Sequence, residues 1–244
     1  MRKIPVTVLI TTANNPPEGL PHLEMKSSIQ RRIAAKAALY FWVSQGVQQI
    51  VLADATASNL LSISEISEIS LSGASIEQIS YEQNSNDVAT RGKGYGEGEL
   101  IQFALDNSRL LKDEENFFKS SGKTYVRNFS EIYDLVCEAN ASSLFWKHLG
   151  DGTWMMFWAD CRFYYSSREF AIQYLLPAYS QADDRDKGAC EYHIYNVLNR
   201  KLKLVNALRP LISGFSGGTG MQYFDGSLGT LDYRCPGWIQ ERNI

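Results

Sequence analysis

Short β-branched runs alternate with helical periodicity through the first half of the chain, and this alternation constrains the fold more than any other feature. Residues 4–12, 47–54 and 75–81 have the composition of strands, whereas residues 26–45 and 63–69 repeat apolar side chains at helical intervals. Parallel strands need crossover connections, which are usually helices. The sequence therefore predicts an α/β fold with a mostly parallel central sheet flanked by helices.

The second half is rich in aromatic residues and predicts a further set of elements. Ser166 or Ser167 precedes one of its helices and has the side chain of an N-cap. We expect strands over residues 116–126, 154–165 and 203–212, helices over 129–139, 168–179 and 190–202, and a glycine-rich loop over 213–220.

The composition excludes several classes of protein. The 244 residues suit one domain over residues 1–244, and the formal net charge of −3 argues against a nucleic-acid-coating protein. The four cysteines show no CxxC spacing, so no metal cluster is expected. No apolar run approaches the roughly 18 residues that span a bilayer, and the N-terminus lacks the pattern of a signal peptide. We therefore expect a cytoplasmic protein with free thiols.

Residues 90–99 form a glycine-rich stretch that carries two cations. Gly92 and Gly94 alternate with Arg91 and Lys93, directly before a helical segment. Glycine lets a backbone approach a ligand closely, and a helix N-terminus offers unpaired N–H groups. The stretch therefore predicts a loop that binds an anion, with phosphate as the first choice. The alternative is a surface turn with two solvated charges.

Polar side chains also follow the predicted strands, and the ligands of open α/β sheets bind at such strand ends. We expect Asp54 to accept hydrogen bonds from a ribose or a base, and Arg91, Lys93 and Lys123 to neutralise phosphates. Together these positions predict a pocket for a phosphorylated nucleotide. Its remaining candidate residues are Thr11, Thr12, Asn14 and Ser121 at strand ends. Ser216 and Thr219, in the second glycine-rich loop, are candidates for contact with the acceptor or a phosphate.

The glycine spacing excludes two common classes of nucleotide-binding protein. A Walker loop requires GxxxxGK[ST], which the chain lacks. A hydride-transferring Rossmann enzyme requires its glycine fingerprint after the first strand, where Asn14-Asn15-Pro16-Pro17 lies instead.

The order of elements resembles that of GT-A-type glycosyltransferases, whose fold is Rossmann-like. Three stretches resemble bacterial sugar transferases of capsule and lipopolysaccharide biosynthesis: RGKGYGEGELIQFAL (91–105), FFKSSGKTYVRN (117–128) and FYYSSREF…LLPAY…CEYHIYNVL (163–198). The resemblance implies a nucleotide-sugar-binding half over residues 1–128 and an acceptor-binding half over residues 129–244. It also implies sugar transfer to a hydroxyl of a growing surface glycan or a lipid-linked acceptor, and leaves peripheral association with the inner face of the membrane open.

The chain departs from the GT-A pattern at the metal site. Most GT-A enzymes carry an Asp-x-Asp motif after the fourth strand, where this chain has Ser121-Gly122-Lys123-Thr124. The carboxylates of Asp183-Asp184-Arg185-Asp186 are expected in a solvated turn. A lysine supplies part of the charge stabilisation that a metal would give to a leaving phosphate. We therefore expect transfer without a required cofactor, with dependence on a divalent metal left open.

An inverting transfer needs a base that takes the proton of the acceptor hydroxyl, and three residues are candidates. Glu191 is the first choice because it falls in the stretch that the resemblance assigns to catalysis or acceptor contact, and Asp160 is the second. His193 cannot face the same site as Glu191 from one helix, since side chains two residues apart point about 200° apart. We therefore expect His193 and Arg162 to contact the acceptor or a phosphate.

Two other functions stay open from the sequence. One is a nucleotide- or phosphosugar-binding protein without catalysis, in which Arg91 and Lys93 supply affinity alone. The other is a sugar nucleotidyltransferase, although the glycine-rich loop of that class normally follows the first strand, where Asn14-Asn15-Pro16-Pro17 lies.

Overall fold

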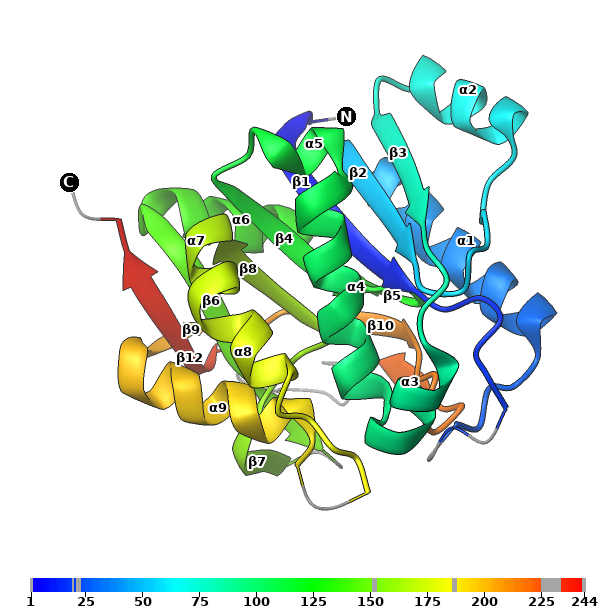
Figure 1. The fold of residues 1–244 in the computed structure, drawn as a ribbon. Coiled ribbons are helices and arrows are strands. Elements are labelled where there is room, and N and C mark those ends of the chain that lie inside the picture. The colour runs from blue at the N-terminus through cyan, green and yellow to red at the C-terminus, as the bar shows by residue number, and fades with distance from the viewer. Residues whose placement is uncertain are drawn as a thin grey trace.

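The first half of the chain builds a parallel sheet (Figure 1). The computed structural model describes residues 2–18, 20, 23–150, 153–185, 188–224 and 234–242. Four strands lie side by side in the order β3-β2-β1-β4, and their three pairings are all parallel. They are β1 (Ile4–Thr12), β2 (Val47–Asp54), β3 (Ser75–Ser80) and β4 (Asn116–Ser121).

The second half continues the same sheet with antiparallel strands, in the order β8-β6-β12-β9 after β4. A small second sheet has the order β11-β10-β5, and β7 pairs with β6. The strands are β5 (Thr124–Val126), β6 (Ala141–Gly150), β7 (Thr153–Ala159), β8 (Phe163–Ser167), β9 (Lys203–Leu208), β10 (Ile212–Phe215), β11 (Gln222–Phe224) and β12 (Arg234–Glu241).

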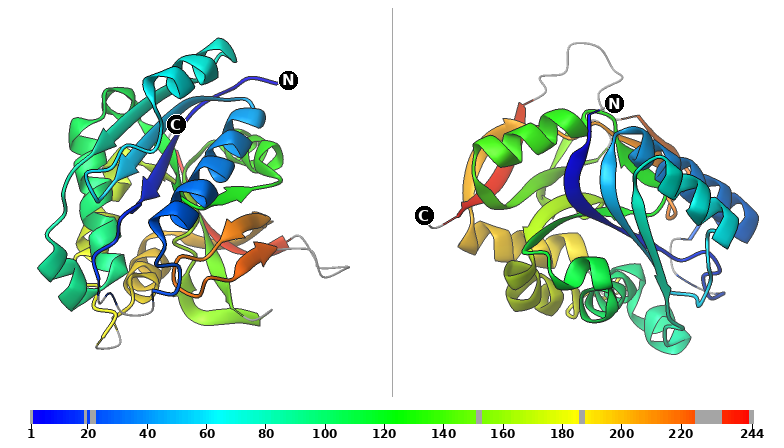
Figure 2. Two further views of the ribbon diagram at one scale, coloured as in Figure 1. Left: turned by 90° about the vertical axis from the view of Figure 1, so that its right-hand side faces the viewer. Right: turned by 90° about the horizontal axis from the view of Figure 1, so that it is seen from above.

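Helices cover both faces of the large sheet (Figure 2). Helices α1 and α6 pack in one hydrophobic core, and α4, α5, α8 and α9 pack in the other. The helices are α1 (Ser28–Ser44), α2 (Ile63–Leu71), α3 (Ser85–Arg91), α4 (Lys93–Asn107), α5 (Arg109–Lys112), α6 (Phe129–Glu138), α7 (Arg168–Phe170), α8 (Leu176–Tyr179), joined to α7 by the π-helical segment Ala171–Leu175, and α9 (Cys190–Lys201).

The strand alternation explains why the sheet needs both layers. Val8 and Ile10 of β1 face the first core, while Leu9 between them faces the second. Successive side chains of a strand point to opposite faces, so a strand that is apolar throughout must be buried on both. Phe117 and Phe118 of β4 divide between the two cores in the same way. The predicted α/β fold with helices flanking the sheet is confirmed.

Several predicted element boundaries need correction. The predicted strand over 203–212 is two strands in different sheets, and β10 runs into the segment predicted as a glycine-rich loop. Ser167, one of the two predicted caps, accepts a hydrogen bond from Phe170 N and begins α7. Within the described residues, no helix has the length and apolar character needed to cross a membrane.

The glycine-rich stretch is helical, which contradicts its prediction as a loop. It spans the end of α3 and the first turns of α4, which meet at Gly92, whose φ of 96° only glycine adopts readily. Gly94, Gly96 and Gly98 are buried within α4. A Cβ at Gly98 would overlap Tyr179, so the glycine lets α4 pack directly on the end of α8. These glycines therefore serve the contact between helices.

We predict that Gly98→Ala destabilises the fold. The added methyl group would collide with the Tyr179 side chain inside a packed interface, and overpacking of this kind costs about 1–3 kcal/mol. Urea unfolding followed by circular dichroism measures the change. Asp106→Ala, at an exposed position of the same helix, is the matched control, and we expect it to change the free energy of unfolding by no more than about 0.5 kcal/mol. Equal stability of the two variants would contradict this role of Gly98.

Candidate functional site

A cavity of about 670 Å³ lies at the carboxyl ends of β1 and β4. Thr11 of β1 pairs with Ser121 of β4, so the two strands end at the same level. The chain passes from β1 to β2 on one side and returns to β4 on the other, which makes this edge a topological switch point. Both halves of the chain line the cavity, including Thr11, Thr12, Lys93, Gly94, Ser121, Lys123, Trp158, Arg162, Glu191 and Ser216.

Besides Arg162, three cationic side chains from separate elements line the cavity: Arg31 of α1, Lys93 of α4 and Lys123 from the turn between β4 and β5. Arg31 is buried and donates to the backbone oxygens of Ala13 and Met25 at 2.6 and 3.1 Å. A Cβ placed on Gly217 would lie 3.2 Å from Lys123 Nζ and 3.5 Å from Arg31 Nη1. The Lys123 ammonium and the Arg31 guanidinium therefore reach the same region.

The cations perturb one another because they are partly removed from water. Burial, with the positive charges of Arg31 and Lys93, lowers the pKa of Lys123 to about 7. Burial also lowers the pKa of Lys93, although Asp184 and Glu191 act in the opposite direction. A site that holds cations close together at this cost is suited to an anion of more than one charge.

Glu191 lines the same cavity from the first turn of α9. Burial raises the pKa of its carboxyl group. Cys190 Sγ donates to its Oε2 atom over 3.2 Å. A partly desolvated carboxylate of raised pKa has the properties of a general base.

Asp160 occupies a different environment from Glu191. Its carboxylate accepts from Arg162 Nε at 2.9 Å and from Nη2 at 2.7 Å, and His148 Nδ1 lies 3.9 Å from its Oδ1 atom. Although burial alone would raise the pKa of Asp160, the Arg162 guanidinium and His148 hold it below its usual range. Asp160 is not among the described residues that line the cavity, so its geometry favours orienting Arg162 over acting as a base.

Arg162 faces the cavity from the turn that precedes β8. Its guanidinium carbon lies 4.6 Å from the centre of the Tyr223 ring, which lines the cavity as well. The ion pair with Asp160 and this ring fix the guanidinium in place beside the cavity.

Asp54 holds the strand ends together and does not line the cavity among the described residues. Its Oδ2 atom accepts from Thr12 Oγ1 at 2.8 Å and from Asn14 N at 2.9 Å, while Oδ1 accepts from Thr56 N at 2.8 Å. These hydrogen bonds use the oxygens of the carboxylate within the protein. Asp54 therefore joins the ends of β1 and β2, and the structure does not show it facing a position where it would contact a ribose or base. Asn14 is buried behind the same strand end.

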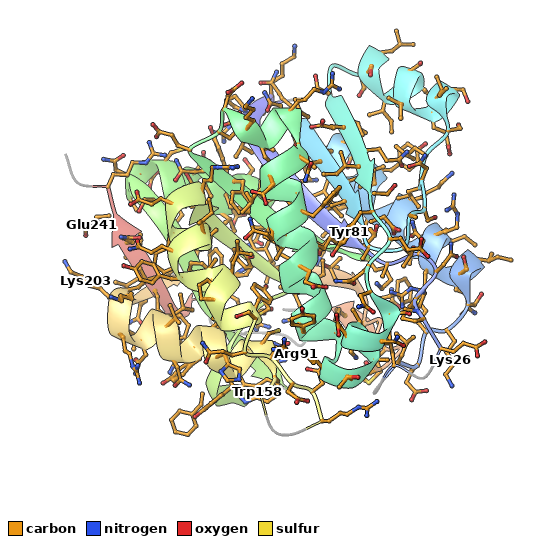
Figure 3. The ribbon with its side chains drawn as sticks, in the orientation of Figure 1. Lys26, Tyr81, Arg91, Trp158, Lys203 and Glu241 are labelled. Atoms are coloured by element: carbon orange, nitrogen blue, oxygen red, sulfur yellow. The ribbon has the colours of Figure 1, made fainter. Side chains whose placement is uncertain are left out.

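Arg91 and Gly92 also lie outside the set of described residues that line the cavity. The Arg91 guanidinium donates to Ser180 O, and its carbon lies 3.9 Å from the centre of the Tyr95 ring. Arg91 is labelled in Figure 3. The predicted contact of Arg91 with a phosphate is therefore wrong for this arrangement, because its side chain joins α3 to the end of α8. Gly92 provides the turn between α3 and α4.

The predicted acceptor residues divide in the same way. Ser216 lines the cavity, whereas His193 and Thr219 are not among its described lining residues. His193 Nε2 is buried near Gly188, and Thr219 N donates to Ser216 Oγ at 3.0 Å. Asp184 differs from the prediction of a solvated turn, because it lines the cavity and its Oδ2 atom accepts from Lys93 N at 2.8 Å.

Three functional candidates were not predicted from the sequence. Arg31 belongs to an ordinary helical pattern, so only the fold reveals that it faces a cavity. Lys119 Nζ donates to Glu97 Oε1 and to Cys161 O, each at 2.6 Å, and the lysine has no exposed surface. Glu97 lines the cavity and also accepts from Thr11 Oγ1 at 2.8 Å. A lysine within an apolar strand was the available signal, since such a charge requires a partner.

The turn that corresponds to the metal-binding motif of the GT-A pattern carries no carboxylate in this chain. Ser121-Gly122-Lys123-Thr124 contributes none, Glu97 pairs with Lys119, and Asp184 accepts from the first turn of α4. Hard cations such as Mg²⁺ prefer several oxygen ligands in one shell. At this turn the side chain that lines the cavity with an ionisable group is Lys123.

We predict that Lys123→Met removes part of the pH dependence of stability. The pKa of Lys123 is lowered to about 7 in the folded protein, whereas an unfolded chain has the ordinary lysine pKa of about 10.4. Between these two pH values the unfolded state binds more protons at Lys123 than the folded state does. Folding stability contributed by this group therefore rises with pH across that window. The difference between wild type and variant in urea unfolding from pH 7 to pH 10 measures it.

Lys112→Met changes an exposed lysine and is the matched control. We expect this variant to keep the wild-type slope of unfolding free energy against pH. If Lys123→Met had the same slope as wild type, Lys123 would not titrate near pH 7.

Comparisons with known proteins found no matching family model and no matching curated protein. Residues 1–349 of S. aureus TarS align at a TM-score of 0.39 and 13% identity, over 80% of this chain and 56% of that chain. The same fragment in complex with UDP aligns at a TM-score of 0.38 and 13% identity, again over 80% of this chain and 56% of that chain. A mannose-1-phosphate geranyltransferase from Thermus thermophilus aligns at a TM-score of 0.31 and 9% identity, over 79% of this chain and 68% of that chain. The chain thus spans little more than half of the TarS fragment, and these values assign it no activity.

Proposed function

We propose that the chain is a glycosyltransferase that moves a sugar from a nucleotide-sugar donor to an acceptor hydroxyl. The observation that carries the proposal is the meeting of Arg31, Lys93 and Lys123 at the carboxyl ends of β1 and β4, in one cavity with Glu191. A diphosphate carries the multiple negative charges that such a cluster attracts, and the cavity volume of about 670 Å³ suits a ligand of that size.

The cations act on the leaving group in this mechanism. As the bond between the sugar and the diphosphate breaks, negative charge grows on the phosphate oxygens. Lys93 and Lys123 stabilise that charge, because fixed cations in a partly desolvated site need no reorganisation during the reaction. Lys123 takes the position that the GT-A pattern gives to a metal site, so transfer is proposed to proceed without Mg²⁺ or Mn²⁺.

Glu191 is the proposed base. It takes the proton of the acceptor hydroxyl as the oxygen attacks the sugar, and its desolvation keeps it basic enough to do so. Asp160 is less suited to this task, because Arg162 holds two of its hydrogen bonds. Arg162 and Ser216 lie in the same cavity and are proposed to orient the acceptor.

The finer assignments extend this proposal. We propose that residues 1–128 bind the donor and residues 129–244 bind the acceptor, which is a growing surface glycan or a lipid-linked sugar. The resemblance to capsule and lipopolysaccharide transferases supports this choice, as does the origin of Lys93 and Glu191 in different halves of the chain. Action in the cytoplasm at the inner face of the membrane belongs to the same proposal.

We predict that Lys93→Met weakens donor binding by about 10- to 100-fold, since a hydrogen bond to a charged group contributes about 1.5–3 kcal/mol. Calorimetric titration with uridine, cytidine, guanosine and adenosine diphosphates and their glucose conjugates identifies the ligand and measures the change. Arg91→Met is the matched control, because Arg91 contacts Ser180 and Tyr95 outside the cavity lining.

The same titrations separate the proposed function from its alternatives. Binding of a nucleoside triphosphate and a sugar phosphate, without binding of an intact nucleotide sugar, would indicate a nucleotidyltransferase. Nucleotide-sugar binding without turnover on any acceptor would indicate a binding protein. No response to any nucleotide would overturn all three functions, and equal affinities of Lys93→Met and Arg91→Met would remove Lys93 from the donor site.

We predict that Glu191→Gln lowers turnover by about 10²-fold or more, which is the contribution typical of a general base. The substitution keeps the size of the side chain, so donor affinity should stay within about twofold of wild type on this proton-transfer argument. Release of the nucleoside diphosphate is measured in EDTA, where transfer should persist. Glu131→Gln, on the exposed first turn of α6, is the control. Turnover of Glu191→Gln close to that of wild type would exclude Glu191 as the base.

A further inference from the structure

Two cysteines that are distant in the sequence meet beside Glu191. Cys161 lies in the turn between β7 and β8, and Cys190 is the first residue of α9. Both thiols are free and buried. The two Sγ atoms and a Glu191 carboxylate oxygen all lie within 4.8 Å of one another. The fold therefore gathers three potential metal ligands at the edge of the cavity.

The spacing of these atoms suits one tetrahedral cation. Zinc binds thiolate sulfur at about 2.3 Å and carboxylate oxygen at about 2.0–2.2 Å, which places neighbouring ligand atoms roughly 3.5–3.8 Å apart in a tetrahedron. Cys190 Sγ and Glu191 Oε2 are 3.2 Å apart before any adjustment. The upper limit of 4.8 Å on the three separations is about 1 Å above this tetrahedral spacing.

The surrounding charges favour the metal-bound form. Two thiolates and a carboxylate carry three negative charges, which a divalent cation reduces to one. Lys119 Nζ donates to Cys161 O at 2.6 Å and pairs with Glu97, and the charge of Lys93 interacts with Glu191 and Cys190, so these charged groups surround the remaining charge.

We propose that Cys161, Cys190 and Glu191 form a site for one thiophilic divalent cation of the zinc class. Cys190 and Glu191 line the cavity, so the fourth coordination position is open to it, as in zinc sites with three protein ligands. Binding replaces two S–H bonds by two S–metal bonds and releases two protons to solvent. The bound cation occupies the Glu191 carboxylate and thereby inhibits transfer, and this consequence rests on the proposed function.

Cobalt(II) tests the site without any assay of activity, because thiolate ligands give it a charge-transfer absorption in the near ultraviolet. The titration uses the 244-residue chain in which Cys137 and Cys235 are serine, so that Cys161 and Cys190 are the two remaining thiols of this sequence. We expect saturation at one cobalt per chain, an absorption from two thiolates, and displacement by Zn²⁺. No thiolate absorption in this folded protein would overturn the site.

Two further substitutions in this background assign the ligands. Cys190→Ser removes a ligand and should weaken cobalt binding by more than the roughly 10- to 100-fold that outer-shell changes cost. Glu191→Gln keeps both thiols and the side-chain size, and should weaken binding while the thiolate absorption stays at saturation. Circular dichroism establishes that each variant is folded. Unchanged affinity in both folded variants would overturn the assignment, and Glu191→Gln decides it if Cys190→Ser does not fold.

The inhibitory consequence has its own readout. In buffer without chelator, Zn²⁺ should inhibit transfer by the wild type, and EDTA should restore it. Cys161→Ser should need at least about tenfold more Zn²⁺ for the same inhibition. Equal inhibition of both proteins would overturn this consequence. If no nucleotide sugar is turned over, the proposed function fails, while the cobalt titration still decides the metal site.

Discussion

The candidate site depends on a buried ammonium group that must be paired. Lys119 lies in the middle of β4 with no exposed surface, and its Nζ atom donates to Glu97 on α4 and to the backbone oxygen of Cys161. Because an unpaired buried charge is very costly, the strand, the helix and the turn before β8 must stay together for the fold to persist. Thr11 donates to the same Glu97 oxygen and ties the end of β1 to this group.

Arg31, Lys93 and Lys123 line one cavity although their positive charges repel one another. Hydrogen bonds to two backbone oxygens hold the Arg31 guanidinium in place beside the two lysines. Because the pKa of Lys123 is lowered to about 7, this lysine can lose its proton near neutral pH, which removes one of the repelling charges. A polyanionic ligand would reverse this effect, because negative charge favours the protonated lysine. Ligand binding and proton uptake are therefore expected to be coupled at this one side chain.

Local sequence patterns predicted the parallel strands of the first half well, but missed β6, β11 and β12 in the second half and found the site in part. Residues 4–12 and 47–54 match β1 and β2 to the residue, because a run buried on both faces leaves a continuous apolar signal. Lys93, Lys123 and Glu191 were predicted and lie in the cavity. Arg31 was missed, because nothing in a helical pattern tells which polar residue faces a cavity. That distinction depends on contacts between elements, which a single sequence does not record.

The glycine-rich stretch shows how such contacts override a local signal. Four alternating glycines predict a loop. In the structure, however, a neighbouring residue occupies the space that a Cβ atom at each of these glycines would need. A Cβ at Gly94 would lie 2.9 Å from Cys190 Sγ, so only glycine lets the start of α4 pack against the start of α9. That contact places Lys93 and Glu191 in one cavity. The glycines therefore act on the site through helix packing, by bringing its cation and its carboxylate together.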